Sequence, residues 1–340
     1  MDYRSSGVDI DAGEEAVRRI RTLARSTFTP AVLSEIGSFG GLFRLGASAY
    51  RDPVLVASAD GVGTKLKIAF MTGRHDSVGG DLVNHCVNDV LVQGAAPLFF
   101  LDYLATGRLS PSTAEQIVSG MAEACRENGC ALLGGETAEM PGFYADGEYD
   151  LAGFIVGVVE RDRVIDGRTI EPGDTLIALP SAGLHTNGYS LARRIVFDQL
   201  GLTADSMVRE LGMTIGEALL APHRSYRGPL AAVLDRGLVR GLAHITGGGM
   251  TDNLPRILPK GTGAEILTGS WEVPPLFRFL QEAGRVPDED MRRTFNMGAG
   301  MVVACAPADH GEVLRLLRAQ GEDAWMAGRV VSGSGVTYVS

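Results

Sequence analysis

The fold is indicated first by the stretch Pro53-Val54-Leu55-Val56-Ala57-Ser58-Ala59-Asp60-Gly61-Val62-Gly63-Thr64-Lys65. Its apolar first part predicts a short strand over residues 53–59. At the strand end, Asp60 can hold magnesium, glycine backbone can approach phosphate oxygens and Lys65 can neutralise charge. The string departs from G-x-x-x-x-G-K-[ST], so a P-loop is excluded. An Asp-Gly hairpin turn would use the same residues.

Strands and helices alternate on both sides of this stretch. A charged segment at 160–173, with turn signals at Asp166-Gly167 and Pro172-Gly173, separates two halves. We therefore expect two α/β domains, 1–170 and 171–340. Helices are expected over 9–25 (in its later part), 81–93, 112–128, 228–235, 275–282 and 308–319 and near 190 and 251, and strands over 96–105, 131–133, 151–159, 174–179 and 300–306.

Composition narrows the class of protein. The chain has 340 residues, 45% of them hydrophobic, and a net charge of -10. An acidic surface repels nucleic acid and anionic lipid, so neither is an expected partner. No apolar run is long enough for a membrane helix, and the start of the chain lacks a signal-peptide core. The four cysteines form no C-x-x-C pair, which indicates buried, reduced thiols in a cytoplasmic protein.

A second candidate site is the helix that begins near Asp81. Its apolar residues Val83, Val87, Val90 and Leu91 form a core face, and its short polar residues Asp81, His85, Asn88 and Asp89 fall elsewhere. Short polar groups suit ligand contact better than a solvated face does. A buried helix with satisfied polar groups is the alternative.

A third candidate is the string Gly134-Gly135-Glu136-Thr137-Ala138-Glu139-Met140-Pro141-Gly142, expected after a strand. Its carboxylates can complete a metal site with Asp60 and Asp89, although an acidic surface loop would look the same. The glycine-rich segments 7–13 and 37–41 can act as lids over a nucleotide or as plain connections.

Two strings in the second half suit an anionic ligand. Ser181-Ala182-Gly183-Leu184-His185-Thr186-Asn187-Gly188-Tyr189-Ser190 precedes an expected helix, where free N–H groups attract phosphate. His185 can contact that anion or transfer a proton, whereas an ordinary helix cap needs neither role. Thr246-Gly247-Gly248-Gly249 can form a backbone nest or a flexible loop. The glycines of 297–301 indicate close backbone packing.

Taken in order, these strings resemble the phosphoribosylformylglycinamidine cyclo-ligase (aminoimidazole ribonucleotide synthetase) family of purine biosynthesis. The resemblance also rests on Gly7-Val8-Asp9-Ile10-Asp11-Ala12-Gly13, Cys86-Val87-Asn88-Asp89, residues 93–103 and Thr294-Phe295-Asn296-Met297-Gly298-Ala299-Gly300-Met301. It covers nearly the whole chain. It implies the synthetase-like fold, of α+β type with two α/β domains, and a homodimer to which the N-terminal domain contributes a sheet.

The resemblance implies ATP-dependent ring closure of formylglycinamidine ribonucleotide, with ADP and phosphate released. Domain 1–170 would bind ATP and dimerise, and domain 171–340 would bind the phosphorylated substrate. The implied ATP contacts are Gly61, Gly63, Thr64, Lys65, Asn88, Asp89 and Glu136, and the implied magnesium ligands are Asp60, Asp89 and Glu136. Catalytic roles fall to His185, Lys65 and Asp60. Substrate contacts fall to His185, Thr186, Asn187, Gly188, Tyr189, Ser190, Thr246, Gly247 and Gly248.

Other readings stay open. Arg21 stands where the family often has lysine, and the two cations are not interchangeable, so its role toward ATP is open. Thiamine-phosphate kinase, selenophosphate synthetase and the glutamine-dependent enzyme of the preceding purine step share the fold. The first cysteine, Cys86, lies in a helix rather than in a glycine-rich N-terminal segment, which argues against the selenophosphate enzyme. A non-catalytic maturation subunit would be expected to lose the acidic residues that this chain keeps.

Overall fold

Residues 10–37, 40–46 and 49–340 are described by the computed structural model. The chain divides into an N-terminal unit, residues 1–90 and 95–162, and a C-terminal unit, residues 91–94 and 163–340. The main crossing therefore lies inside the charged segment 160–173. Residues 91–94 and 163–170, which the sequence analysis places in the first domain, belong to the C-terminal unit.

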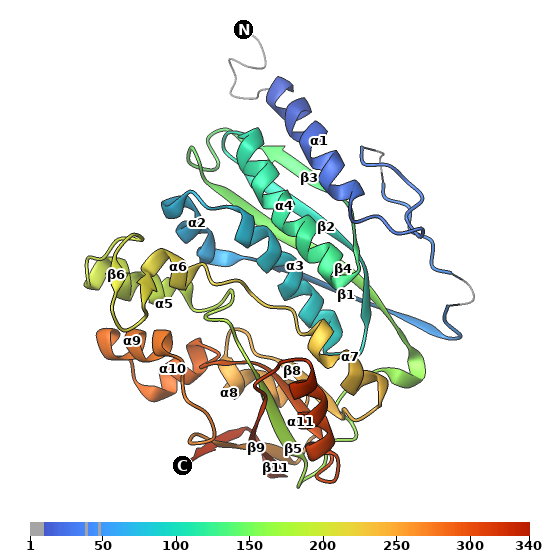
Figure 1. Cartoon of the computed structure of the whole chain (residues 1–340), viewed down its shortest axis with the longest axis vertical. Coiled ribbons are helices and arrows are strands. Elements are labelled where there is room, and N and C mark those ends of the chain that lie inside the picture. The colour runs from blue at the N-terminus through green and yellow to red at the C-terminus, as the bar shows by residue number, and fades with distance from the viewer. Residues whose placement is uncertain (1–9, 38–39, 47–48) are drawn as a thin grey trace. The chain divides into compact units, whose positions relative to one another are not determined.

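The N-terminal unit is built on a four-stranded sheet of order β1-β4-β2-β3 (Figure 1). Its strands are β1 (Pro53–Gly61), β2 (Ala96–Thr106), β3 (Ala131–Glu139) and β4 (Tyr149–Glu160). Strand β4 pairs antiparallel with β1 and β2, whereas β2 and β3 run parallel. The helices of this unit are α1 (Ile10–Arg25), α2 (Leu66–Thr72), which follows the short turn η2 (Gly63–Lys65), α3 (Asp76–Leu91) and α4 (Pro111–Asn128).

Helices cover one face of this sheet and leave the other partly open. Leu82 of α3 lies against the strand position of Gly153, where a Cβ would approach it to 2.9 Å. Burial alternates along β1, and its outward residue Leu55 keeps 60% of its surface exposed. Phe154 of β4, on the same face by register, keeps 46% exposed. This is the pattern of an antiparallel sheet with one core face.

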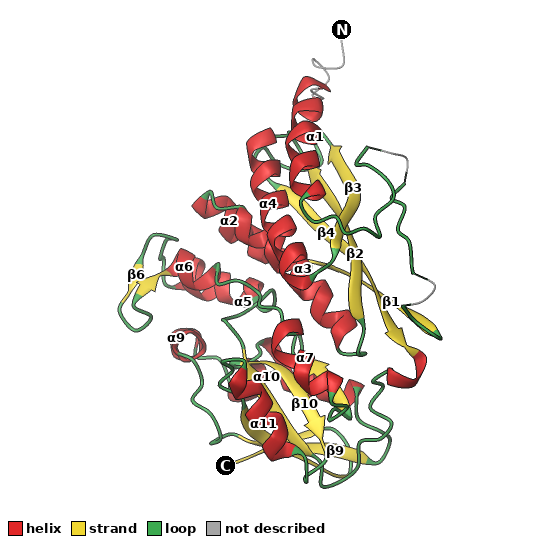
Figure 2. Cartoon of the chain, turned by 45° about the vertical axis from the view of Figure 1, so that its right-hand side comes forward, coloured by secondary structure: helices red, strands yellow, loops and turns green. Residues whose placement is uncertain are grey.

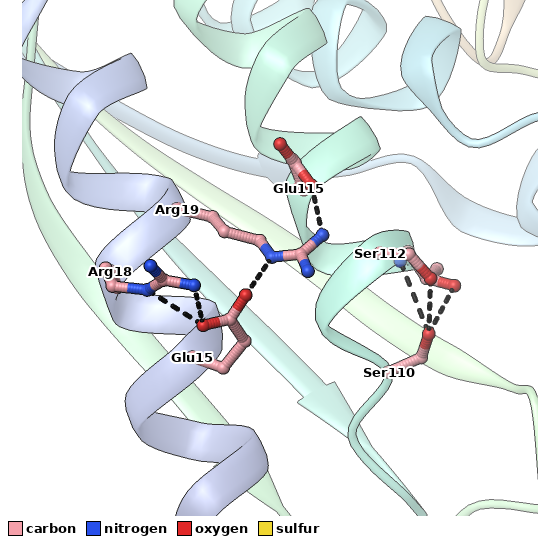
Figure 3. Close-up of polar contacts among 7 residues, drawn as sticks. Glu15, Arg18, Arg19, Ser110, Ser112 and Glu115 are labelled. Atoms are coloured by element: carbon pink, nitrogen blue, oxygen red, sulfur yellow. Dashed lines mark hydrogen bonds and ion pairs between the residues drawn. The ribbon is translucent and has the colours of Figure 1, made fainter.

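Helix α4 begins and ends where local chemistry directs. Ser110 caps its start by accepting a hydrogen bond from the Thr113 amide, Pro111 follows, and Gly129 ends it in the left-handed conformation. Arg19 of α1 joins the two helices, because its guanidinium donates to Glu15 and to Glu115, each at 2.6 Å (Figure 3). These exposed pairs orient α1 on α4 but add little stability.

The C-terminal unit contains a six-stranded sheet of order β12-β9-β11-β5-β10-β8 and a small hairpin of β6 and β7 (Figure 2). All its neighbouring strands are antiparallel except β12 and β9. The strands are β5 (Thr175–Pro180), β6 (Met207–Val208), β7 (Met213–Thr214), β8 (Gly241–His244), β9 (Thr262–Leu267), β10 (Ala299–Cys305), β11 (Trp325–Ser332) and β12 (Val336–Val339).

Both faces of this second sheet are buried. Helices α7 (Arg227–Asp235) and α11 (His310–Ala319) pack on one face, against residues such as Ile177 and Val303. Helix α8 (Gly249–Asn253) and the turn η5 (Leu254–Arg256) pack on the other, against residues such as Leu176 and Val302. Strand β10 is buried along its whole length. The remaining helices are α5 (Tyr189–Arg193), continued by the π-helical segment Arg194–Gln199, α6 (Ile215–Leu219), α9 (Pro275–Gly284) and α10 (Asp288–Thr294).

Several element boundaries differ from the sequence-based prediction. Strand β3 continues to Glu139 and β1 to Gly61, so both acidic strings lie in strands rather than after them. Residues 10–13 belong to α1 instead of a lid, and residues 7–9 lie outside the described part. All four cysteines are buried and free of disulfides, as expected. Within the described residues, no helix combines the length and apolarity needed to cross a membrane.

Candidate active site residues in the two units

In the N-terminal unit, Asp60 ends the β1 strand beside helix α3. One carboxylate oxygen accepts from the Gly61 amide at 2.7 Å, and the other lies 2.8 Å from Nε2 of His85. The Asp60 side chain is 40% exposed, whereas that of His85 is buried. His85 therefore holds the carboxylate at the strand end while part of it faces solvent, as a metal or phosphate contact requires.

Lys65 lies in a different environment from the one expected. Its side chain is fully buried, and its ammonium group lies 2.6 Å from the equally buried Asp81 carboxylate. Burial lowers the pKa of Lys65, and the Asp81 charge opposes that shift. The pair joins η2 to α3, so Lys65 neutralises a carboxylate of its own unit in this structure. Direct contact between Lys65 and ATP stays a prediction. Gly63 and Thr64, just before it, are exposed.

The polar residues of helix α3 are mostly buried. Asp81, His85 and Asn88 are buried, and Asp89 is partly exposed. The Ser58 hydroxyl donates to Asp89 at 3.0 Å, and Ser58 precedes Asp60 by two positions on the same face of β1. Asp60 and Asp89 thus lie on the helix-covered side of the sheet, near its β1 edge. Of the two readings of this helix, burial applies to most of its polar groups and ligand access to Asp89.

Glu136 lies apart from these two carboxylates. Strand register aligns Asp60, Gly153, Asp102 and Gly135 across the sheet, and the next row contains Gly61, Ala152, Tyr103 and Glu136. Neighbouring rows point to opposite faces. Exposed Glu136 is therefore on the open face and at the opposite sheet edge from β1. The expected set of three carboxylates does not assemble within one chain, since their oxygens do not all lie within 4.8 Å of one another.

Asp102 is a carboxyl group that the sequence analysis missed. It lies on the helix-covered face, and a Cβ added to Gly135 would come within 2.1 Å of its Oδ1, so glycine is required there. Burial raises the pKa of Asp102 to about 7. The surrounding atoms are dense although some of its surface stays accessible. Asp102 is therefore partly protonated near neutral pH.

In the C-terminal unit, the expected substrate string is tightly bonded. His185 is buried in the left-handed region at φ 60°, which is uncommon for a residue with a side chain. The Ala182 amide donates to its Nε2 at 3.2 Å. Tyr189, also buried, donates to the carbonyls of His185 and Leu219. Gly188 precedes α5 in the left-handed conformation without a side-chain cap, so the expected Ser or Asn cap is not formed.

Three histidines gather around this string. The ring of His223 stacks on that of His185 with centroids 4.2 Å apart and planes 19° apart. Its Nε2 lies 3.0 Å from Nε2 of His244, and its Nδ1 lies 3.3 Å from the Thr186 hydroxyl. His223 and His244 were not predicted, because neither lies in a string with a local signal for a ligand.

The three imidazoles do not suit one metal ion, although one nitrogen from each lies within 4.8 Å of the others. A metal ion must lie close to the plane of each ligating ring, about 2 Å from its nitrogen. Two rings that stack almost parallel have no such point in common. In addition, the Ala182 amide occupies Nε2 of His185. The cluster is therefore better described as a hydrogen-bonded imidazole group.

The glycine string 246–249 is fixed rather than loose. The Asn253 amide donates to the carbonyls of Gly249 and Gly247 at 2.8 and 3.1 Å, and the Thr246 hydroxyl donates to Asn253 at 3.3 Å. The carbon of an added side chain at Gly247 would lie 3.2 Å from Oδ1 of Asn187, so the two substrate strings lie side by side. Gly248 precedes α8 at φ 97°.

Residues 294–301 connect the strings by the close packing expected of them. Asn296 donates to the Gly183 carbonyl and accepts from the Ser181 hydroxyl and the Gly298 amide. At Gly300, a Cβ would lie 1.9 Å from the Tyr226 hydroxyl and 2.7 Å from the His185 ring. The structure thus brings His185, Thr186, Asn187 and Gly247 together, and the exposed Ser190 lies at the margin.

Comparisons with known proteins cover almost all of the chain. Residues 45–159 match the family model of the AIR synthase related protein N-terminal domain, and residues 171–339 match that of the C-terminal domain. Together they include both units and every expected site string except the first.

Curated relatives are similar over nearly full length. The chain is 58% identical to the phosphoribosylformylglycinamidine cyclo-ligase of Trichlorobacter lovleyi over 98% of this chain and 95% of that protein. It is 52% identical to the cyclo-ligase of Geobacillus kaustophilus over 99% and 97%.

Solved structures share the fold at low identity. A thiamine-monophosphate kinase from Stenotrophomonas maltophilia superposes with a TM-score of 0.72 at 20% identity, covering 95% of both chains. The hydrogenase maturation protein HypE in complex with ATP gives 0.64 at 20% identity, covering 93% of this chain and 86% of that one. These likenesses establish the α/β architecture and do not distinguish the activities.

Proposed function

The chain belongs to the phosphoribosylformylglycinamidine cyclo-ligases of the AIR synthase related family, and from this premise we propose how its residues divide the reaction between the two units. The reaction is ATP-dependent closure of formylglycinamidine ribonucleotide to 5-aminoimidazole ribonucleotide, with release of ADP and phosphate. The identity of 50–58% to named cyclo-ligases carries this function, over a kinase that shares only the fold.

The N-terminal unit would bind the phosphates of ATP. Asp60 and Asp89 support this role, because both carboxylates lie beside the exposed residues Gly63 and Thr64 that follow β1. They suit magnesium, which is usually held by one or two carboxylates together with substrate phosphates. When bound, the ion would neutralise phosphate charge. Gly61 and Asn88 would support this site from β1 and α3, and Glu136 would approach ATP only from the open face of the sheet.

The C-terminal unit would hold the ribonucleotide between the strings 185–190 and 246–249. Their supporting feature is rigidity, since Asn253 and Asn296 bond both strings through backbone groups. Phosphorylation by ATP would turn the formamide oxygen into a leaving group. The neighbouring nitrogen would attack the activated carbon, lose a proton and expel phosphate. Alignment and charge neutralisation would supply most of the rate, without a covalent enzyme intermediate.

We propose a homodimer through the open face of the N-terminal sheet, in a cytoplasmic enzyme. Leu55 and Phe154 expose apolar surface there, which is typical of an interface. Replacement of Phe154 by glutamate should convert the dimer into a monomer in light scattering, with the fold retained by circular dichroism. A wild-type chain that is monomeric at micromolar concentration would remove this proposal.

The activity is tested by incubating the purified chain with formylglycinamidine ribonucleotide, ATP and magnesium. Aminoimidazole ribonucleotide and ADP should form in equal amounts. The Asp60→Asn variant should turn over about 100-fold more slowly, by loss of charge at the phosphates. Asp162→Asn, which removes an exposed carboxylate paired with Arg51, serves as the matched control. Absence of product, with phosphorylation of thiamine phosphate instead, would refute the cyclo-ligase assignment.

A further inference from the structure

His223 is a buried histidine at the centre of the C-terminal unit that the roles above leave unused. It lies in the connection at 220–226 between α6 and α7, and none of its ring is exposed. The connection reads Leu220-Ala221-Pro222-His223-Arg224-Ser225-Tyr226. A buried imidazole with polar contacts at both nitrogens needs a reason beyond packing, since an apolar ring would fill the same space without two desolvated nitrogens.

The contacts of His223 join both substrate strings. Nδ1 meets the Thr186 hydroxyl at 3.3 Å, in the first string. Nε2 meets Nε2 of His244 at 3.0 Å, and His244 ends strand β8 two residues before Thr246 of the second string. The ring face covers His185. His223 therefore touches three residues that lie in or beside the proposed substrate site.

The proton count of these contacts is restricted. Two ring nitrogens 3.0 Å apart hold one hydrogen between them, so one nitrogen donates and the other accepts. In a neutral imidazole, the choice at Nε2 fixes the state of Nδ1. If His223 donates from Nε2 to His244, its Nδ1 accepts from the Thr186 hydroxyl. If His244 donates instead, the Nδ1–H of His223 donates to Thr186.

We propose that His223 is a positioning residue that passes a proton between Thr186 and His244. The proposal rests on the cyclo-ligase function, because ring closure removes a proton from the attacking nitrogen. That proton would reach the Thr186 oxygen as the Thr186 hydroxyl proton moves to Nδ1 of His223. The Nε2 proton of His223 then moves to Nε2 of His244, which becomes an imidazolium. One proton is displaced at each step, and no bond to the enzyme forms.

The first test separates proton transfer from packing. His223→Phe keeps a flat ring against His185 and removes both nitrogens. It should lower kcat about 100-fold, the scale of general acid–base catalysis, with KM for ATP and the ribonucleotide changed less than threefold. His75→Phe is the matched control, because His75 lies in the N-terminal unit and bonds only Tyr149 among the contacts in the structure, at 2.9 Å. Its kcat should stay within twofold of wild type.

A second variant keeps the test valid if His223→Phe fails to fold. His223→Ala leaves space for a free imidazole, which has a nitrogen for each partner. Added imidazole should raise kcat of this variant at least tenfold, whereas N-methylimidazole, which cannot bond at both ends, should not. Equal rescue by both compounds, or wild-type kcat in His223→Phe, would overturn the relay. Absence of product from the wild-type chain would instead overturn the cyclo-ligase function itself.

Discussion

The two sheets of the molecule are buried in different ways, and their sites differ accordingly. In the N-terminal unit, helices cover one face and the strand β1 alternates between buried and exposed residues. In the C-terminal unit, both faces are covered and β5 and β10 are almost continuously buried. Carboxylates at the edge of a half-covered sheet can reach a solvated, multiply charged ligand. Imidazoles inside a doubly covered unit can hold protons in fixed places.

This contrast makes different demands on polar groups. Asp60 is partly solvated, so its charge needs few protein partners. The histidines around His223 are desolvated, and each must be bonded within the unit. Lys65 and Asp81 break the pattern, because they form a fully buried ion pair in the unit with the open sheet. Variants of these groups can therefore break or sharpen the comparison.

The largest effect is expected from Lys65→Met. This change leaves Asp81 as a buried carboxylate without its ammonium partner, which should cost about 3–5 kcal/mol of unfolding free energy. Urea unfolding of the N-terminal transition measures it. If Lys65 acts mainly on ATP, stability would instead stay near that of wild type while turnover fell.

A double variant sharpens that test. Lys65→Met combined with Asp81→Leu removes both charges and should recover most of the lost stability, since buried pairs are often replaceable by apolar residues. A double variant as unstable as Lys65→Met would show that the pair is not the cause.

The next effect concerns the packing of the imidazole group. Gly300→Ala places a Cβ where the Tyr226 hydroxyl and the His185 ring lie, at 1.9 and 2.7 Å. We expect a loss of about 1–3 kcal/mol from overpacking, with a fall in kcat as His185 shifts. Gly311→Ala is the matched control, because nothing lies within 4 Å of its Cβ position in α11. The control should be neutral or slightly stabilising in thermal unfolding.

A smaller effect is expected at Asp102, through pH. Its pKa of about 7 exceeds that of an unfolded aspartate, so the folded state binds more protons between about pH 4 and 7. The stability contributed by this group is therefore present at low pH and lost as pH rises to 7. Asp102→Asn should gain about 1–2 kcal/mol relative to wild type between pH 5 and 8, less than the full shift because the side chain is partly accessible. Parallel unfolding curves at both pH values would contradict this.

Much of the fold follows from local signals, and the rest depends on neighbouring strands. Helix α4 has its expected cap at Ser110 and end at Gly129. Strand β3 was expected to end at Leu133, because glycines and acidic residues are poor strand formers. Pairing with β2 carries it to Glu139. Strands β8, β9, β11 and β12 were not predicted, because their short segments acquire strand structure from partners distant in sequence.

The site was predicted in its parts more than in its contacts. Asp60, His185 and the glycine string lie in motifs that mark themselves in the sequence. Ending β3 too early hid the alternation that places Glu136 on the face opposite Asp60. His223 lies in a connection without a motif, and its role depends on the approach of Thr186 and His244 from other elements. Such contacts cannot be inferred from one sequence.

The central claim, that the N-terminal unit binds ATP and the C-terminal unit binds the ribonucleotide, is tested most directly by calorimetric titration of two variants with each ligand. Asp60→Asn should weaken binding of a non-hydrolysable ATP analogue with magnesium at least tenfold and leave ribonucleotide binding within twofold. His185→Asn, a residue that tolerates the left-handed backbone, should give the opposite result. Loss of the same ligand in both variants would contradict the division of roles.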